Sequence, residues 1–227
     1  MKRILVILFA ASSLTVARAD FVLKQQIKSV GQNGVVTLEV KDDQSRLDMP
    51  TDLLGDVSVI QDLNTGDKTM MIHQRKIAKL ESGAEVRQSA EQFGYSTNGV
   101  VPKPVDTGKT GKVGDYDTEI YTWTNNNGVG GTLWVAKNYP DFDKIKIYLK
   151  KLEESPAGQM MRGDSPDGNT LPGMVVKSEK VAHGDIITET LISAKEQPVN
   201  ASDFDVPDDY RIIGLPITTN PTTTPDK

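Results

Sequence analysis

Four aspartates crowd into a short segment near the C-terminus, ASDFDVPDDY (residues 201–210), and closely spaced carboxylates can bind calcium or exchange protons. They are Asp203, Asp205, Asp208 and Asp209. An EF-hand loop starting at Asp203 would need a third oxygen ligand, a glycine and a final glutamate at fixed positions. Pro207, Asp208 and Gly214 stand at those positions. The spacing therefore does not predict an EF-hand calcium site.

Other catalytic and metal-binding patterns are nearly absent from the sequence. The chain has two histidines, His73 and His183, and no cysteine, which excludes a structural zinc site and a cysteine nucleophile. A Ser-His-Asp triad would have to use one of these histidines, and neither a G-x-S-x-G nor a G-x-x-x-x-G-K-[ST] motif is present. We therefore expect no metal, no cofactor and no enzymatic activity. A hydrolase using two of the 31 acidic residues remains an alternative, because the geometry of such a pair is set by the tertiary structure.

Large apolar side chains in or beside expected strands are the other candidates for a site. They are Tyr121, Trp123, Trp134, Met70, Met160, Met161 and Met174. Methionine adapts to irregular apolar shapes, so these residues could line a ligand cavity. They could equally fill an ordinary core, since every sheet needs such residues.

The N-terminus predicts export. Lys2 and Arg3 precede an apolar run, Ile4–Val16, and the small-x-small pattern Ala17-Arg18-Ala19 follows, which is typical of a signal peptide (residues 1–19) cleaved before Asp20. The run is too short to span a bilayer comfortably. Because no cysteine stands at the cleavage point, we expect a periplasmic or secreted protein with no lipid anchor. The net charge of −5 and pI of about 5.1 argue against a nucleic-acid partner.

The mature chain opens with strand and turn signals. Val36, Leu38 and Val40 alternate with polar residues, which predicts a half-buried strand. Asn33-Gly34 predicts a two-residue turn linking it to a strand near Phe21–Val30. Later strands are expected at Asp56–Asp62, Lys68–His73, Tyr116–Thr124, Thr132–Lys137, Met174–Val181 and Ile186–Lys195.

Two helices interrupt the strands. Ser82 and Glu85 have the spacing of a capping box, which predicts a helix over Ser82–Phe93, and a loop is expected from there to about Lys112. Pro140 is placed to open a second helix, with an apolar stripe of Phe142, Ile145, Leu149 and Leu152. The expected organisation is one antiparallel-sheet domain (residues 20–215) and a disordered Thr/Pro-rich tail (residues 216–227).

Four segments occur in an order that resembles a known family. They are Lys112–Tyr121, Leu133-Trp134-Val135, Leu171–Met174 and Asp203–Tyr210. In this order the chain resembles the DUF4412 family of exported bacterial proteins and, more loosely, the periplasmic lipoprotein-carrier (LolA-like) superfamily. The resemblance implies an α+β fold: a strongly curved antiparallel sheet, or half-barrel, with about two helices on its concave side and room to shelter acyl chains. It also implies that the terminal segment closes the sheet, with Phe204 inward, Pro207 ending the strand and the aspartates in solvent.

Three functions follow as hypotheses. The first is an exported non-enzymatic protein that binds an apolar or acylated ligand through Trp123, Trp134, Tyr121, Met70, Met160 and Met161. The second is a structural or protein-interaction module of the cell envelope with a solid core and no ligand. The third is the carboxylate-based hydrolase, for which two carboxyl groups should face each other across a cleft.

Overall fold

One large sheet dominates the computed structural model, which describes residues 20–92, 99–160, 162–182 and 184–214. Its strands are β1 (Phe21–Ser29), β2 (Gln32–Lys41), β3 (Gln44–Thr51), β4 (Gly55–Asp62), β5 (Lys68–Ile72), β6 (Ile77–Glu81), β7 (Val105–Val113), β8 (Tyr116–Thr124), β9 (Gly130–Ala136), β10 (Met174–Ala182), β11 (Asp185–Glu196) and β12 (Arg211–Ile213). The α-helices are α1 (Gly83–Gln92), α2 (Phe142–Glu154) and α3 (Pro156–Met160). Short 3-10 turns lie at η1 (His73–Arg75), η2 (Gly168–Thr170) and η3 (Ala201–Phe204).

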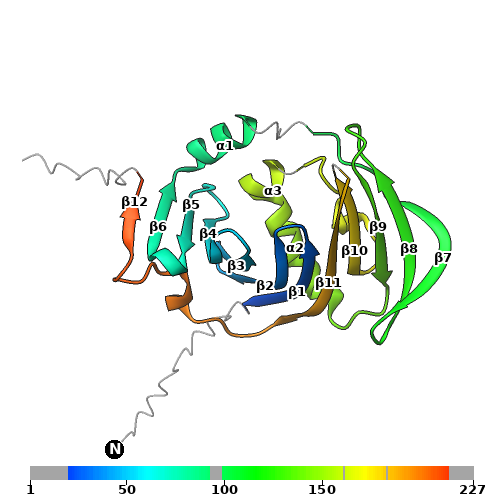
Figure 1. Ribbon diagram of the computed structural model, residues 1–227. Helices are drawn as coiled ribbons and strands as arrows, with labels where there is room; N and C mark the ends of the chain where they lie inside the picture. The colour runs from blue at the N-terminus through cyan, green and yellow to red at the C-terminus, as the bar shows by residue number, and fades with distance from the viewer. Residues whose placement is uncertain (1–19, 93–98, 161, 183, 215–227) are drawn as a thin grey trace, which may run out of the picture.

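Strand β1 lies near the middle of the sheet. The strand order is β12-β6-β5-β4-β3-β2-β1-β11-β10-β9-β8-β7, and β1 pairs antiparallel with both β2 and β11. The short pair between β12 and β6 is parallel, and the other pairs are antiparallel. Figure 1 shows the strands arranged in an arc, with α2 and α3 inside it. The expected α+β fold built on an antiparallel sheet is confirmed, and the sheet is large and open.

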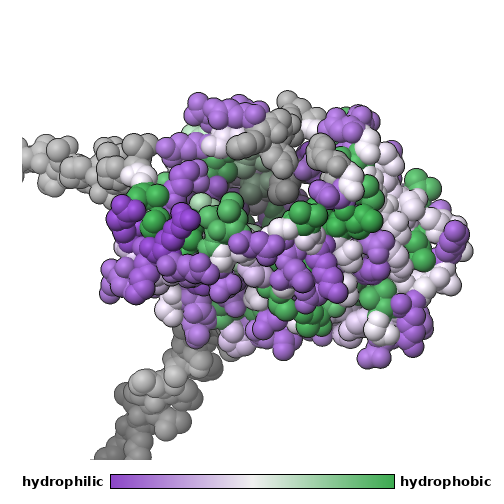
Figure 2. Space-filling view, in the orientation of Figure 1, coloured by the Kyte–Doolittle hydropathy of each residue, from purple (hydrophilic) through white to green (hydrophobic). Residues whose placement is uncertain are grey.

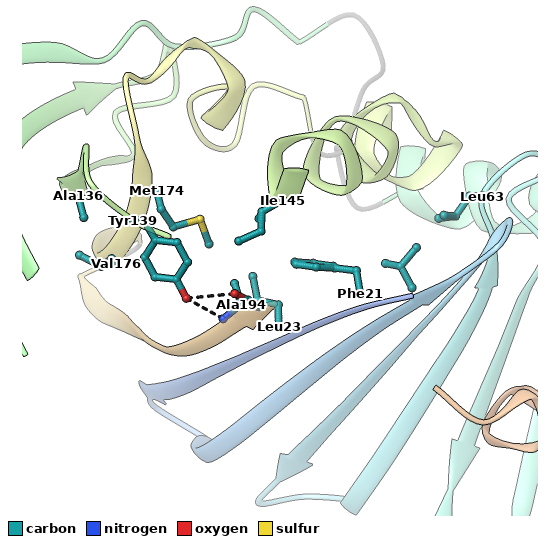
Figure 3. Close-up of a cluster of buried hydrophobic side chains, with 10 residues drawn as sticks. Phe21, Leu23, Leu63, Ala136, Tyr139, Ile145, Met174, Val176 and Ala194 are labelled. Atoms are coloured by element: carbon teal, nitrogen blue, oxygen red, sulfur yellow. Dashed lines mark hydrogen bonds between the residues drawn. The ribbon is translucent and has the colours of Figure 1, made fainter. Parts of the chain in front are cut away.

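Helix α2 packs its apolar stripe on the inner face of the sheet. Ile145 is fully buried and points toward side chains that come from the strands (Figure 3). Together these side chains form the inner cluster: Phe21, Leu23, Val40, Leu63, Ala136, Tyr139, Ile145, Met174, Val176 and Ala194. The Phe21 ring stacks on Tyr148 of α2 with 5.0 Å between centroids. Burying each such side chain contributes about 1.5–3 kcal/mol, so the predicted stripe anchors α2 to the sheet.

The C-terminal segment covers the opposite, outer face. Val22 alternates with Phe21 and Leu23 along β1, and it belongs to an outer cluster. The outer cluster consists of Val22, Ile60, Met71, Ala78, Val199 and Phe204. Phe204 is 8% exposed, and Lys76 forms a 2.6 Å ion pair with Asp209 before β12 joins the edge of β6.

The aspartate-rich segment thus serves as a structural closure. Asp205, Asp208 and Asp209 are exposed, and Phe204 packs inward as expected. The expectation that Pro207 ends a strand is wrong, because Phe204 ends the 3-10 turn η3 and Pro207 lies in the irregular segment that follows.

Several local predictions are also wrong. The first hairpin turns at Val30–Gly31, where Gly31 has a φ of 80°, and Asn33-Gly34 lies within β2. Gly34 is needed for packing, because a Cβ there would lie 2.5 Å from the Pro50 side chain. Residues Val105–Val113, expected as loop, form the edge strand β7, whose two faces are largely exposed and so lack an apolar alternation. The short helix α3 is a third helix where two were expected.

Two expected segments lie outside the described residues, namely the signal peptide (residues 1–19) and the tail (residues 216–227). The strands of the described residues form one continuous sheet. In those ranges no helix combines the length and the apolar character needed to cross a membrane.

Candidate functional site

A cavity of about 350 Å³ lies between the sheet and the 164–171 segment. Its apolar lining is Trp123, Leu133, Leu171, Val175 and Ile187, and its polar lining includes Gln25, Asp164, Ser165, Ser178, Glu179, Lys180 and Glu189. The sheet residues of this lining come from β1, β8, β9, β10 and β11. Figure 2 shows hydrophobic residues gathered where Figure 1 draws the upper ends of β9 and β10. An apolar pocket with a few convergent polar groups is the usual form of a small-molecule site.

Trp123 is the largest side chain in the lining of this cavity, and its polar atom lacks a hydrogen-bond partner. It is 5% exposed and packs with Leu133, Val135 and Leu171. Its indole Nε1 is buried and has no hydrogen-bond partner among the described residues. Gly131 faces it across the β8–β9 pair, and a Cβ at Gly131 would lie 3.0 Å from Nε1 and 2.2 Å from the Glu179 carbonyl oxygen. A side chain larger than glycine at this position would therefore clash with the backbone of β10.

The polar side of the cavity carries mostly negative charge. The Ser178 hydroxyl donates to Glu189 Oε2 at 3.0 Å, and Glu179 pairs with Lys177 at 2.7 Å. Lys180 is half-buried and forms no ion pair within the part of the chain that the structure describes. The lining therefore offers hydrogen-bonding groups beside an apolar floor.

A second cavity of about 410 Å³ opens on the other side of the same segment, between α2, α3 and residues 162–169. Glu153 of α2 lies in its wall and accepts a hydrogen bond from the Gly168 N–H at 3.1 Å and another from the Asn169 side-chain amide. Burial, together with a hydrogen bond and repulsion from Asp167, raises the pKa of Glu153 to about 7. Burial opposes ionisation of Asp167 too, but hydrogen bonds from Glu153 and Asn169 outweigh it and lower the pKa of Asp167.

This carboxyl pair has the geometry of a structural contact. Glycosidases hold their two carboxyl groups at least about 5 Å apart so that the sugar fits between them. Glu153 and Asp167 are instead hydrogen-bonded directly to each other, with the amide of Asn169 alongside. The pair therefore fastens the 164–171 segment to α2 and leaves no space for a scissile bond.

His73 joins a polar network on the outer face. Its Nε2 lies 2.5 Å from Ser58 Oγ and its Nδ1 lies 2.6 Å from the Tyr210 hydroxyl, while Ser58 donates to Asp48. In a catalytic triad the acid would contact the histidine Nδ1, whereas here the acid contacts the serine. Ser58 is 1% exposed beneath the C-terminal segment, so the network cross-links that segment to the sheet. The other histidine, His183, lies outside the described residues.

The structure brings only some of the predicted ligand-binding residues together: Tyr121 packs against the cluster that contains Trp123, and the other described ones lie elsewhere. Trp123 lines the cavity, but Trp134 lies on the opposite side of β9 from Leu133, where Lys177 stands 4.3 Å from its ring centre. Tyr121 donates to Glu119 at 3.0 Å, and burial together with that carboxylate raises the pKa of Tyr121 to about 12.

The methionines are dispersed as well. Met70 is half-buried in β5, on the far side of the sheet order from β8, and Met160 is buried in α3. Met161 lies outside the described residues.

Several cavity residues had no distinguishing sequence signal. Leu171, Val175 and Ile187 are ordinary aliphatic residues. The strand register brings Val175 and Ile187 to Trp123, and Leu171 comes from the segment that precedes β10. The alternation in β8 and β9 could have placed Trp123 with Leu133 once their pairing was known. Among the described residues, no three acidic or histidine side chains are grouped so that they could hold a metal ion.

Comparisons with known proteins identify the family and a related fold. A solved structure of an uncharacterized conserved protein from Thermus thermophilus is 5% identical, with a TM-score of 0.53, over 86% of this chain and 90% of that one. At this identity the likeness concerns the fold.

Two further solved structures align at lower scores. The Mycobacterium tuberculosis lipoprotein LppX is 12% identical, with a TM-score of 0.43, over 80% of this chain and 88% of that one. A LolA superfamily protein from Nitrosomonas europaea is 9% identical, with a TM-score of 0.29, over 82% of this chain and 89% of that one. A comparison with curated proteins found no match. The family model for the domain of unknown function DUF4412 matches residues 22–210, and the chain therefore belongs to the DUF4412 family.

Proposed function

We propose that the protein is an exported, non-enzymatic binding protein that holds an apolar or acylated ligand in a cavity beside a half-barrel sheet. The observation that carries the proposal is the Trp123 cavity, in which apolar side chains lie beside several hydrogen-bonding groups. A ligand with an apolar body and a few polar atoms would find both kinds of contact there.

The site fits a small or single-chain ligand. Its volume of about 350 Å³ is at the low end of the range of about 300–1,000 Å³ that ligand pockets span. The 164–171 segment forms one wall and is fastened by the Gly168–Glu153 hydrogen bond and by the Asn125 amide, which donates to the Gly163 carbonyl at 2.9 Å. Loosening this segment would admit the ligand without disturbing the sheet.

Export agrees with the N-terminal sequence. Cleavage before Asp20 would keep a residue that the fold uses, because the Asp20 carboxylate pairs with Lys41 at 2.9 Å and accepts from the Val199 N–H at 2.9 Å. We propose that the mature chain works in the periplasm or outside the cell.

Binding of Nile red, a neutral apolar probe, tests the proposal with a pair of matched variants. Val175→Trp would place a large ring in the cavity wall, whereas Val105→Trp makes the same change at an exposed position of the edge strand. We expect saturable binding to the wild type and to Val105→Trp, and at least about tenfold weaker binding to Val175→Trp. A wild type that does not bind the probe, or equal binding by a folded Val175→Trp variant, would favour a structural module with no ligand.

A further inference from the structure

The 164–171 segment is the wall between two cavities. Ser165 and Pro166 line both the Trp123 cavity of about 350 Å³ and the second cavity of about 410 Å³. Among residues 162–173, all of which the structure describes, the 3-10 turn η2 is the sole regular element. Because neither a sheet nor an α-helix holds this wall, its position depends on a few contacts with its neighbours.

The two ends of the wall are attached through groups that do not ionise. Before the segment, the Gly163 carbonyl accepts from the Asn125 side-chain amide at 2.9 Å. At its other end, Leu171 is 3% exposed and packs in the cluster that contains Trp123. These attachments should therefore hold at any pH at which the protein is folded.

The middle of the segment is attached through one carboxyl group, that of Glu153 in α2. It accepts from the Gly168 N–H at 3.1 Å and from the side-chain amide of Asn169. The same carboxyl group is hydrogen-bonded to that of Asp167, and two carboxyl groups can share a hydrogen bond only while one of them carries a proton. The attachment of the middle therefore depends on the proton of Glu153.

The charges around this pair determine when the proton is lost. Burial, together with the hydrogen bond and repulsion from Asp167, raises the pKa of Glu153 to about 7, although two amide donors favour its ionised form. Arg162 favours the ionised form of Asp167. The other charged side chains of the second cavity, Lys150 and Glu154, form an ion pair at 3.6 Å. On ionising, Glu153 therefore faces a second carboxylate at close range.

We infer that the 164–171 segment is a strap: the protonated Glu153–Asp167 pair holds it closed, and loss of the Glu153 proton opens it and joins the two cavities. The ligand then enters or leaves the Trp123 cavity from the side of α2 and α3. The part of this inference that concerns the ligand rests on the proposed function and adds its regulation by pH.

The size of the effect follows from linkage between the proton and the open form. When the strap is open, Glu153 is solvated and its pKa returns toward the ordinary value of 4.5, so the open form gains on the closed form as the pH rises to about 7. The side chain is half-buried, and solvent screening reduces the effect. We expect the open fraction to rise about five- to thirtyfold between pH 5 and pH 8.

Hydrogen exchange of backbone amides measures this opening without any ligand. The Gly168 amide donates to Glu153, and the Leu171 amide donates to the Gly168 carbonyl, so both report on the strap. Protection is taken relative to an unstructured peptide at the same pH. In the wild type, the protection of these two amides should fall about five- to thirtyfold between pH 5 and pH 8.

Three variants identify the group responsible. Glu153→Gln keeps an oxygen for the Gly168 N–H and cannot ionise, so its protection should be the same at both pH values. Asp167→Asn keeps an oxygen for the Asn169 N–H and removes the second carboxylate, so the fall should be smaller than in the wild type. Glu154→Gln changes the neighbouring exposed carboxylate and should leave the fall unchanged.

Nile red, which is uncharged in this pH range, tests the consequence for the ligand. If the strap controls the path, the association and dissociation rates of the wild type should both be about five- to thirtyfold faster at pH 8 than at pH 5. The affinity should change by less than about twofold, because the closed form predominates at both pH values. In Glu153→Gln, neither rate should depend on pH.

The outcomes separate the strap from the binding function. Equal protection of the two amides at pH 5 and pH 8 in the wild type, or an undiminished fall in Glu153→Gln, would overturn the strap and leave the proposed function standing. A fall in protection with Nile red rates that do not depend on pH would overturn the path through the strap. Failure of Nile red to bind would overturn the proposed function and the path with it, while hydrogen exchange would still decide whether the strap opens.

Discussion

Glu153 should make the protein less stable as the pH rises from about 4.5 to about 7. Its pKa is raised from 4.5 to about 7 in the folded protein, so between these values the folded chain holds a proton that the unfolded chain has released. The contribution of Glu153 to the free energy of unfolding is therefore fully present below about pH 4.5, and it is lost as the pH rises to about 7. Asp167 acts in the opposite direction, but its lowered pKa places that effect at more acidic pH.

The magnitude follows from the same pKa. Each tenfold change in proton affinity corresponds to about 1.4 kcal/mol, which sets an upper limit of about 3 kcal/mol for Glu153. The side chain is only half-buried and shares its proton with Asp167, so screening reduces the expected effect to about 1–2 kcal/mol. Glu153→Gln removes the charge, keeps an oxygen for the Gly168 N–H and provides a donor for Asp167.

Urea unfolding at pH 5 and pH 8 measures this effect. We expect Glu153→Gln to match the wild type at pH 5 and to exceed its free energy of unfolding by about 1–2 kcal/mol at pH 8. The control is Glu154→Gln, which changes the neighbouring exposed residue and should stay within about 0.5 kcal/mol at both values. A Glu153→Gln variant that is equally destabilised at both pH values would refute the assignment of a raised pKa to this carboxyl group.

Three further substitutions test the packing. Ile145→Ala removes a fully buried side chain between α2 and the sheet and should lower the free energy of unfolding by about 2–5 kcal/mol, measured by urea denaturation; a loss below about 1 kcal/mol would contradict this packing. Phe204→Ala should cost about 3–5 kcal/mol and increase hydrogen exchange in β6, whereas unchanged exchange there would argue against the closure role of the terminal segment. Ser82→Ala removes the capping hydroxyl of α1 and should cost about 1 kcal/mol, and a neutral result would show that the cap does not stabilise the helix.

Capping residues and apolar patterns within a segment predicted the helices and strands that these same residues stabilise. The Ser82–Glu85 capping box is present, with the Glu85 carboxylate accepting from the Ser82 N–H at 2.7 Å, and the stripe of α2 faces the core. Strands with a buried face, such as β8 and β11, were predicted nearly to their ends. Strands without one were missed, because β7 gains its order from pairing with β8 rather than from its own pattern.

The site was less predictable than the fold. Trp123 could be proposed from its type and its strand, but its separation from Trp134 depends on the register of β8 against β9. The carboxyl pair of Glu153 and Asp167 joins residues fourteen positions apart through a loop whose path no periodic pattern specifies. Tertiary contacts of this kind lie outside what spacing along a chain can predict.

The most direct test of the central claim is native mass spectrometry, with solvent extraction, of the mature protein purified from a bacterial periplasm. The account predicts a mass above that of the mature chain and an extractable apolar or acylated ligand, which Val175→Trp should lose and Val105→Trp should retain. A clean mass of the chain alone, unchanged after incubation with Nile red, would contradict the claim that the Trp123 cavity is a binding site.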